Sequence, residues 1–461
     1  MSRPSSDLEL LIRLDRGTGP LHRQIERQVE SAIRSGALAA GAAMPSSRQL
    51  ADQLGVSRGV VIEAYGQLIA GGYLMSEARR APRVADVGDH SPSSQSRRLP
   101  PPKRFDYDLR PGRPSLETFP RAAWSRALRR AVQSTDDSSF GYPDPGGHPA
   151  LRASLAEYLG RVRGVATSAD NVIVTQGATQ GIGLIGRALA GRGFRAVGLE
   201  DPSHRDQRAL MEGAGLEVVP VAVDADGLQV SALAPSRAET VLVTPAHQFP
   251  TGVLMSPSRR SQLISWVDES DRYVLEDDYD AEFRFAGSPV GAIQGLRPDR
   301  VVYIGSTSKA LSPALRIGWV IVPQDLHDDV VRLKRYADLG SPTVPQLALA
   351  DLIDSGDYDR HLRRVRQLYG KRRRAVVRAV ERGFPGADVL GIEAGLHVAI
   401  RVEALDERRF QQLAEQQASV AIGVLGEHAI KFQPASALLL GFAAETENRL
   451  QVAVNRLAKL L

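Results

Sequence analysis

Residues 301–319 of the chain read VVYIGSTSKALSPALRIGW. The first part is a short apolar run of the kind that forms a buried strand, and it passes into small and hydroxyl-bearing residues. Lys309 lies among those hydroxyl groups, and Arg316 follows two turns later. Taken alone, such a loop favours a solvated lysine, so the rest of the chain must decide whether a pocket surrounds this amine.

Four earlier stretches share this pattern of an apolar run that ends in polar or small residues: NVIVTQG (171–177), AVGLE (196–200), TVLVTP (240–245) and YVLEDD (273–278). Helical patterns such as QRALMEGAG (207–215) and SRRSQLISWVDE (258–269) lie between the strand-like runs. This alternation predicts an α/β domain with a largely parallel sheet.

In such sheets ligands collect beyond the carboxyl ends of the strands. The polar residues that follow the predicted strands are therefore expected to approach one another: Gly177-Ala178-Thr179, His204, His247, Asp277, Tyr279 and Lys309.

These residue types suit one cofactor. An unprotonated lysine amine forms a Schiff base with an aldehyde, an aspartate keeps a pyridinium nitrogen protonated, and a tyrosine hydroxyl can donate to a phenolic oxygen. Ser306, Ser308 and Arg316 could hold a phosphate, helped by backbone N–H groups at the helix start of residues 177–179. The combination indicates pyridoxal 5'-phosphate. Alone, EDDYDAEFR (276–284) would also fit an acidic turn or a cation site, but the order of the motifs favours the cofactor.

Composition limits the alternatives. A chain of 461 residues with 43% apolar and 24% charged residues is expected to form two or three globular domains. The absence of cysteine excludes disulfides, thiolate metal sites and a cysteine nucleophile, and it fits a reducing compartment. The N-terminus lacks the pattern of a signal peptide, and no apolar run approaches the ~20 residues that span a bilayer. We therefore expect a cytoplasmic protein that does not contact a membrane.

The net charge lies at one end of the chain. Residues 1–105 hold 15 Lys and Arg against 10 Asp and Glu, which accounts for the whole formal charge of +5. Excess positive charge on a small segment favours a polyanionic partner, although a solvated basic face would produce the same count.

The same segment predicts a helix-turn-helix. Leu21, Ile25, Val29 and Ile33 recur every four residues, as in an amphipathic helix. Pro45 and Ser46 then open a short helix that Gly55 ends, and Ser57 is placed to cap a second helix with Arg58 at its exposed start. Such a second helix can enter a major groove.

The following residues, GYLMSEARRAPRVA (72–85), predict a small hairpin with Arg79, Arg80 and Arg83 near its tip. Residues 86–105 are rich in Ser, Pro and charge, and they predict a linker.

Residues 44–74, MPSSRQLADQLGVSRGVVIEAYGQLIAGGYL, resemble the winged helix of the GntR family. That resemblance implies that Arg48, Ser57 and Arg58 contact double-stranded DNA. The tip EARRAP (77–82) departs from the family's glycine-rich wing.

The whole chain resembles the MocR/GabR transcriptional regulators, in which a GntR-type domain precedes an aminotransferase-like domain of fold type I. The motifs that carry this resemblance are LRPGRPSLETFPRAAW (109–124), GYPDPGGHPALRASLAEYL (141–159), EDPSH (200–204), TPAHQFPTG (244–252), LEDDYDAEFRF (275–285), GSTSKALSPALRIGW (305–319) and LLLGFA (438–443). It implies a DNA-binding domain over 1–85, a linker over 86–105 and an effector domain that binds pyridoxal 5'-phosphate over 106–461.

The resemblance also implies roles. Lys309 would form the Schiff base, Asp277 would pair with the ring nitrogen and Tyr279 would contact the phenolic oxygen. A set of five residues would bind the phosphate: Ala178, Thr179, Ser306, Ser308 and Arg316. Tyr142 would reach the phosphate of a neighbouring subunit, which implies a homodimer.

Three positions depart from the family pattern. His204 replaces the tyrosine that stacks on the ring, and Phe249-Pro250 replaces an asparagine that donates to the ring oxygen, which leaves that role to Tyr279 with His247 or Gln248. Leu438 and Leu439 stand where relatives that bind an amino acid carry a carboxylate-binding arginine, so Arg208 or another arginine would have to substitute.

Two functions follow as hypotheses. The first is a transcriptional regulator that responds to an amine or amino-acid effector, or to the cofactor itself as a measure of vitamin B6 status. The second is an active aminotransferase with an appended DNA-binding domain. The missing arginine favours the regulator, in which the aminotransferase-like domain would not turn over substrate. An inert fold that has lost its cofactor is disfavoured because Asp277, Tyr279, Lys309 and Arg316 are all present.

Overall fold

The computed structural model describes residues 12–76, 80–86, 103–432 and 435–461. The chain divides into two compact units, Met1–Lys103 and Arg104–Leu461, each of which is described by itself. Arg79 at the predicted hairpin tip and residues 87–102 of the predicted linker lie outside the described residues.

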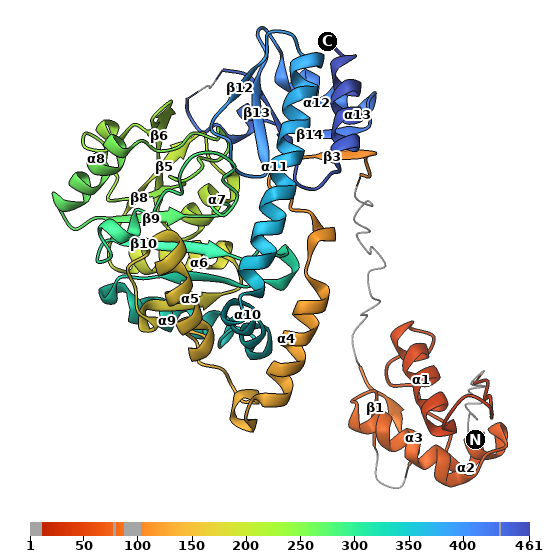
Figure 1. Ribbon diagram of the computed structural model, residues 1–461. Helices are drawn as coiled ribbons and strands as arrows, with labels where there is room; N and C mark the ends of the chain where they lie inside the picture. The colour runs from red at the N-terminus through yellow and green to blue at the C-terminus, as the bar shows by residue number, and fades with distance from the viewer. Residues whose placement is uncertain (1–11, 77–79, 87–102, 433–434) are drawn as a thin grey trace. The chain divides into compact units, whose positions relative to one another are not determined.

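The N-terminal unit contains the predicted helix-turn-helix and hairpin (Figure 1). Its elements are α1 (Leu21–Arg34), α2 (Ser47–Leu54), α3 (Arg58–Ala70), β1 (Leu74–Met75) and β2 (Arg83–Val84), with β1 and β2 antiparallel. One apolar cluster joins them, in which Ile25 and Val29 of α1 pack with Leu50 of α2 and with Val61 and Leu68 of α3.

Local sequence explains where α2 and α3 begin and end. The Ser46 side chain accepts from the Gln49 backbone N–H at 3.2 Å, and the Gln49 side chain accepts from the Ser46 N–H at 3.0 Å, which is a complete capping box. Gly55 ends α2 in the left-handed region at a φ of 62°. Ser57 occupies the N-cap position of α3 as predicted, but its side chain makes no capping hydrogen bond.

The C-terminal unit is built on an eight-stranded sheet in the order β4-β11-β10-β9-β8-β5-β6-β7. The five strands from β10 to β6 run parallel to their neighbours, whereas β11 is antiparallel to both of its neighbours and β7 is antiparallel to β6. The sheet therefore has the predicted largely parallel character. Its strands are β4 (Val172–Thr175), β5 (Ala196–Asp201), β6 (Glu217–Asp224), β7 (Gly227–Leu228), β8 (Thr240–Val243), β9 (Tyr273–Asp277), β10 (Val301–Ser306) and β11 (Gly318–Ile321).

Helices cover both faces of this sheet (Figure 1). Alternate residues of one strand show this directly, because Val172 and Val174 of β4 pack into one apolar cluster while Ile173 packs into another. The first cluster includes residues of α4 (Arg121–Ser134), α5 (Pro149–Arg163), α10 (Thr343–Asp354) and α11 (Asp357–Gly383). The second includes residues of α6 (Ala178–Gly191), α7 (Arg205–Gly213) and α9 (Gln324–Asp338). A further cluster involves α8 (Pro257–Asp268).

A second, five-stranded sheet has the order β12-β13-β15-β14-β3. It comprises β3 (Tyr107–Leu109), β12 (Asp388–Leu390), β13 (His397–Arg401), β14 (Val420–Val424) and β15 (Ala437–Gly441), with α12 (Glu407–Gln416) and α13 (Glu447–Ala458) packed against it. The long helix α11 extends from the first sheet to this one (Figure 1). In the described part of the chain no helix has the length and apolar character needed to cross a membrane.

The packing of α1 predicts a local stability effect. Ile25 is fully buried, so Ile25→Ala should destabilise the N-terminal unit by about 2–5 kcal/mol through lost contacts and a residual cavity. Ile62 is 51% exposed, and Ile62→Ala should change stability by less than about 0.5 kcal/mol. Hydrogen exchange of the peptide that covers residues 21–34 measures the difference. The three tryptophans all lie in the C-terminal unit, at 124, 266 and 319, so an unchanged fluorescence transition serves as the internal control.

Candidate functional site

A pocket of about 200 Å³ lies beyond the carboxyl ends of β9 and β10, and we call it the strand-end pocket. Nine of the ten residues expected at a cofactor line it: Ala178, Thr179, His204, Asp277, Tyr279, Ser306, Ser308, Lys309 and Arg316. The tenth, Tyr142, is 92% exposed and does not line this pocket. Its predicted role was in a neighbouring subunit, and one chain does not test that role.

The Lys309 amine is held at one wall of the pocket. Its Nζ donates to the carbonyl oxygen of Gly112 at 2.6 Å. Gly112 has a φ of 75°, and a Cβ added there would lie 3.3 Å from Nζ, so a side chain would crowd the amine. Burial lowers the pKa of Lys309, with the Asp280 and Asp277 carboxylates opposing that shift. A lowered pKa raises the fraction of neutral, nucleophilic amine at a given pH.

Asp277 carries an incomplete set of hydrogen bonds. Its Oδ2 accepts from the Gln207 side chain at 2.8 Å, whereas its Oδ1 is buried and has no hydrogen-bond partner within the described ranges of the chain. Burial raises the pKa of this carboxyl to about 7. A buried acceptor without a donor is costly, so a bound group that brings an N–H to Oδ1 would remove that cost. A protonated pyridine ring is such a group.

The opposite end of the pocket has the features of an anion site. The helix α6 begins at Ala178, and its N-cap Gly177 has a φ of 94°, a conformation that favours glycine. A Cβ at Gly177 would lie 3.2 Å from the guanidinium nitrogens of Arg316, which therefore sits directly against this turn. Arg316 also donates to the carbonyl of Gln176. With the helix N-terminus and the hydroxyls of Ser306 and Ser308, this arrangement suits a phosphate.

Tyr279 is supported from behind by a histidine. The Nδ1 of His247 lies 3.0 Å from the Tyr279 hydroxyl oxygen and 3.0 Å from Oδ2 of Asp280. An ionised carboxylate can only accept a hydrogen bond, so Asp280 accepts from the Nδ1 proton of His247 or from the hydroxyl proton of Tyr279. Burial raises the pKa of Tyr279 well above its usual value, which keeps that proton in place.

Neither substitute considered for the missing asparagine lines the strand-end pocket. His247 reaches it only through Tyr279. The Gln248 amide donates to the carbonyls of Pro202 and Phe249 at 2.8 and 2.7 Å, which is a structural role in the turn.

His204 lines the pocket beside Phe249, with 5.3 Å between the ring centroids. Its Nδ1 accepts from the Asp206 backbone N–H at 3.2 Å and caps α7. Burial lowers the pKa of His204, so the imidazole favours the neutral form.

Among the described residues, the strand-end pocket has no further cation that could bind a substrate carboxylate. Leu438 and Leu439 are fully buried in β15, and Arg208 pairs with Glu212 at 2.9 Å instead of lining the pocket. The cations among the lining residues are Lys309 and Arg316.

Two contacts near the site were not predicted from the sequence. Arg163 pairs with Asp278 at 2.8 Å in the buried interior and also donates to the Val290 carbonyl at 2.6 Å. The Asp201 carboxylate accepts three backbone N–H bonds of 2.7–2.8 Å from residues 430–432. The first contact secures the residue after Asp277, and the second joins the end of β5 to the segment that follows β14.

In the N-terminal unit, Arg48, Ser57 and Arg58 are all exposed. The Arg58 Nε donates to the Ser47 hydroxyl at 3.2 Å, which joins the start of α3 to the start of α2. On the hairpin, Arg83 donates to the carbonyl of Gly41 at 2.8 Å.

Comparison with known families gives two matches. Residues 109–457 match aminotransferase class I and II, and residues 21–84 match the bacterial regulatory proteins of the gntR family.

Two regulatory proteins are similar over most of this chain. The chain is 33% identical to the probable rhizopine catabolism regulatory protein MocR of Rhizobium meliloti, over 97% of this chain and 95% of that protein. It is also 33% identical to the HTH-type pyridoxine biosynthesis transcriptional regulator PdxR of Corynebacterium glutamicum, over 82% of each.

Among solved structures, the C-terminal unit resembles aminotransferases. An archaeal alanine:glyoxylate aminotransferase is 25% identical with a TM-score of 0.70, covering 78% of this chain and 90% of that chain. The kynurenine aminotransferase of Pyrococcus horikoshii is 25% identical with a TM-score of 0.71, covering 78% and 91%.

The buried ion pair predicts a large mutational effect. Arg163→Met should lower the free energy of unfolding by about 3–5 kcal/mol, because it leaves the Asp278 carboxylate buried without its cation. Arg161 lies two residues before Arg163 on α5 and pairs at the surface with Asp359, so Arg161→Met should lower the free energy of unfolding by at most about 1 kcal/mol.

Denaturant unfolding followed by tryptophan fluorescence compares these two variants. The double variant Arg163→Met/Asp278→Asn should lose less stability than Arg163→Met alone, because the unpaired charge is gone. Equal losses in Arg163→Met and Arg161→Met would contradict the assignment of a buried pair.

Proposed function

The chain belongs to the MocR/GabR-type transcriptional regulators, a GntR-family DNA-binding domain followed by an aminotransferase class I and II domain, and on that premise we propose that its DNA binding responds to a ligand held in the strand-end pocket. The ligand system consists of pyridoxal 5'-phosphate together with an amine or amino acid, or of the cofactor alone. The boundaries 1–85, 86–105 and 106–461 form part of this proposal.

The observation that carries the cofactor assignment is the unpartnered Oδ1 of buried Asp277 in the same pocket as the Lys309 amine. When bound, pyridoxal 5'-phosphate supplies an aldehyde that condenses with amines and a ring that withdraws electrons. Asp277 would hold the proton on the ring nitrogen, and Gln207 keeps the carboxylate oriented. Tyr279 would donate its hydroxyl proton to the phenolic oxygen.

The remaining pocket residues would fix the ring and the phosphate. His204 would stack on the ring, with less area than a tyrosine provides. The phosphate would be held by the start of α6, by two serines and by one arginine: Ala178, Thr179, Ser306, Ser308 and Arg316. Tyr142 would add a contact from a second copy of the chain, and its 92% exposure is consistent with an interface role in a homodimer.

The lack of a carboxylate-binding cation favours regulation over turnover. An aminotransferase needs a charge that fixes the substrate carboxylate, and here Leu438 and Leu439 are buried while Arg208 is committed to Glu212. An effector amine without a carboxylate, or the cofactor itself, fits this pocket better than an ordinary amino acid. The relative PdxR is a regulator of pyridoxine biosynthesis and MocR is a probable regulator of rhizopine catabolism, so a link to vitamin B6 metabolism has a precedent among the relatives.

The alternative is an active aminotransferase with an appended DNA-binding domain. The residues that would hold the cofactor permit that chemistry, and steady-state assays with amino-acid and keto-acid pairs distinguish the two. We expect turnover to be absent or marginal.

The cofactor assignment predicts a visible absorbance band that depends on Lys309. Purified full-length protein with added pyridoxal 5'-phosphate should show the band of a cofactor bound through a lysine amine, and Lys309→Ala should lose or shift it. Asp277→Ala should weaken cofactor binding at least tenfold, because it removes a charge-assisted hydrogen bond worth about 1.5–3 kcal/mol. Arg208→Ala is the matched control outside the pocket. A parent protein without a band would refute the cofactor assignment.

The DNA-binding assignment predicts that Arg58→Ala weakens binding by about 1–3 kcal/mol, through the loss of a phosphate or base contact. The target is a duplex selected by the full-length protein from a random-sequence library. Arg27→Ala, an exposed arginine on α1, should change affinity less than threefold. Equal affinities of Arg58→Ala and the parent would exclude α3 as the recognition helix.

A further inference from the structure

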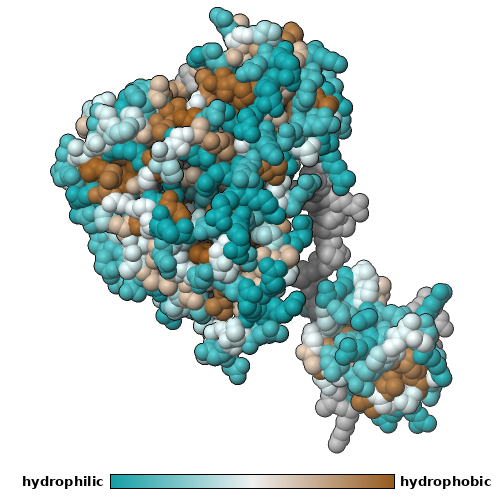
Figure 2. Space-filling model, in the orientation of Figure 1, coloured by the Kyte–Doolittle hydropathy of each residue, from teal (hydrophilic) through white to brown (hydrophobic). Residues whose placement is uncertain are grey.

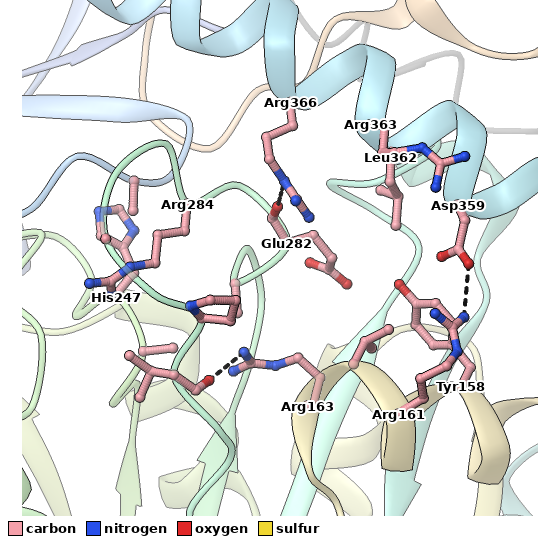
Figure 3. A pocket seen from close by; sticks show the side chains of 17 residues that line it. Tyr158, Arg161, Arg163, His247, Glu282, Arg284, Asp359, Leu362, Arg363 and Arg366 are labelled. Carbon is pink, nitrogen blue, oxygen red and sulfur yellow. Dashed lines mark hydrogen bonds and ion pairs between the residues drawn. The ribbon is translucent and has the colours of Figure 1, made fainter.

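A second cavity, separate from the strand-end pocket, opens on the C-terminal unit with a volume of about 510 Å³ (Figure 3). Most of its lining comes from three segments: the end of α5, the loop of residues 281–290 after β9, and the first turns of α11. Ala246, His247 and Ala394 complete it. It shares no lining residue with the strand-end pocket. We call it the arginine cleft, because five arginines line it: Arg161, Arg163, Arg284, Arg363 and Arg366.

Two of these arginines are neutralised by carboxylates. Arg161 pairs with Asp359 at 2.8 Å, and Arg163 pairs with Asp278 at the same distance. Figure 3 shows the Arg161–Asp359 pair at one end of the cleft. Arg284, Arg363 and Arg366 take no part in these two ion pairs.

The remaining three guanidinium groups have no ion pair with a carboxylate in the described part of the chain. Arg284 donates to the Ala286 carbonyl at 2.9 Å, and Arg366 donates to the Glu282 carbonyl at 2.7 Å, so each uses one of its five N–H groups on a neutral acceptor. Arg366 extends from α11 toward Glu282 in Figure 3. Along α11 the surface of this unit is hydrophilic (Figure 2), as expected if these groups face solvent.

The acid within the cleft offsets this charge only in part. Glu282 is the one lining carboxylate, among the described residues, that forms no ion pair. Burial raises the pKa of Glu282 to about 7, so near neutral pH a substantial fraction is uncharged. The cleft therefore carries an excess of positive charge in a recessed space, and guanidinium groups bind carboxylate and phosphate oxygens through paired N–H donors.

One residue that lines the cleft also contacts a residue of the strand-end pocket. His247 lines the cleft, and its Nδ1 is the hydrogen-bond partner of the Tyr279 hydroxyl. The imidazole is confined, because Gly252 and Gly395 lie against it at φ values of 74° and 73° and a side chain at either position would crowd the ring. A negative charge held beside this ring changes the potential at Nδ1, and hence the strength of its bond to Tyr279.

We propose that the arginine cleft binds a small polyanion, a di- or tricarboxylate or a phosphorylated metabolite, through Arg284, Arg363 and Arg366, and that His247 transmits its presence to Tyr279. The binding clause stands on the cleft alone. The transmission clause rests on the proposed cofactor site, because Tyr279 would contact that cofactor.

Isothermal titration calorimetry on the cofactor-loaded, full-length protein tests the binding clause, with citrate and pyrophosphate as probes and sodium chloride at matched ionic strength as the control. Citrate or pyrophosphate should bind to one site per chain, and the double variant Arg363→Gln/Arg366→Gln should weaken the binding at least tenfold. Arg378→Gln is the matched control, because Arg378 is an exposed residue of α11 that does not line the cleft.

Each outcome either identifies the chemical class of the ligand or contradicts the proposal. Binding of citrate alone indicates a carboxylate ligand, binding of pyrophosphate alone indicates a phosphorylated one, and binding of both indicates recognition of charge. No saturable heat with either probe, or an equal loss in Arg378→Gln, would overturn the proposal. Unchanged thermal unfolding of each variant excludes misfolding as the cause, and Arg284→Gln provides an independent third variant.

The transmission clause has its own measurement. Addition of the bound probe should shift the pH titration of the visible cofactor band in the parent protein, and His247→Gln should abolish the shift at probe concentrations that saturate this variant by calorimetry. A parent band that does not respond would overturn transmission only. Absence of any visible band would instead refute the proposed cofactor, and the calorimetric result would still decide the cleft.

Discussion

The parallel pairing of β9 with β10 places the groups of the strand-end pocket. Asp277 stands opposite Ile304, two residues before Ser306, so one register brings the last residue of β9 and the loop that carries Lys309 to the same edge of the sheet. A slip of one residue would turn Asp277 to the other face and bring Asp278 in its place. On the other side of β10, Ser306 pairs with Gly318 of β11. This pairing places the segment that carries Arg316 near the start of α6.

Closely packed backbones are part of the same constraint. A Cβ at Gly318 would lie 2.7 Å from the Cα of Gly177, so the start of α6 and β11 can approach this closely only because residue 318 is glycine. The proposed phosphate site depends on this close approach, because the approach places the Arg316 guanidinium against Gly177, the N-cap of α6. Close backbone packing at this point therefore helps to place the side chains on which the chemistry of the pocket depends.

Much of this arrangement could be predicted from the sequence, because apolar runs mark buried strands and the polar residues after them mark the sheet edge. The strands that begin at Val172, Thr240 and Tyr273 are predicted in this way, whereas the helices of the N-terminal unit are predicted from apolar spacing and from residues that begin or end helices. The supporting contacts were not. Gln207 is an ordinary polar residue within a helix, and nothing in its local sequence indicates that it faces Asp277. Arg163 lies 115 residues from Asp278, and only the folded sheet determines which of two adjacent acids faces the pocket and which one meets the arginine.

Asp201 connects the two sheets of the C-terminal unit through hydrogen bonds that oppose motion of one sheet relative to the other. Its carboxylate is 2% exposed and satisfies three consecutive backbone N–H groups of residues 430–432. Rotation of the second sheet away from the first would break all three charge-assisted hydrogen bonds together and leave a buried carboxylate without these partners. The contact therefore opposes even a small rotation. His204 follows Asp201 by three residues, so the turn that carries this contact between the sheets leads directly into the aromatic wall of the strand-end pocket.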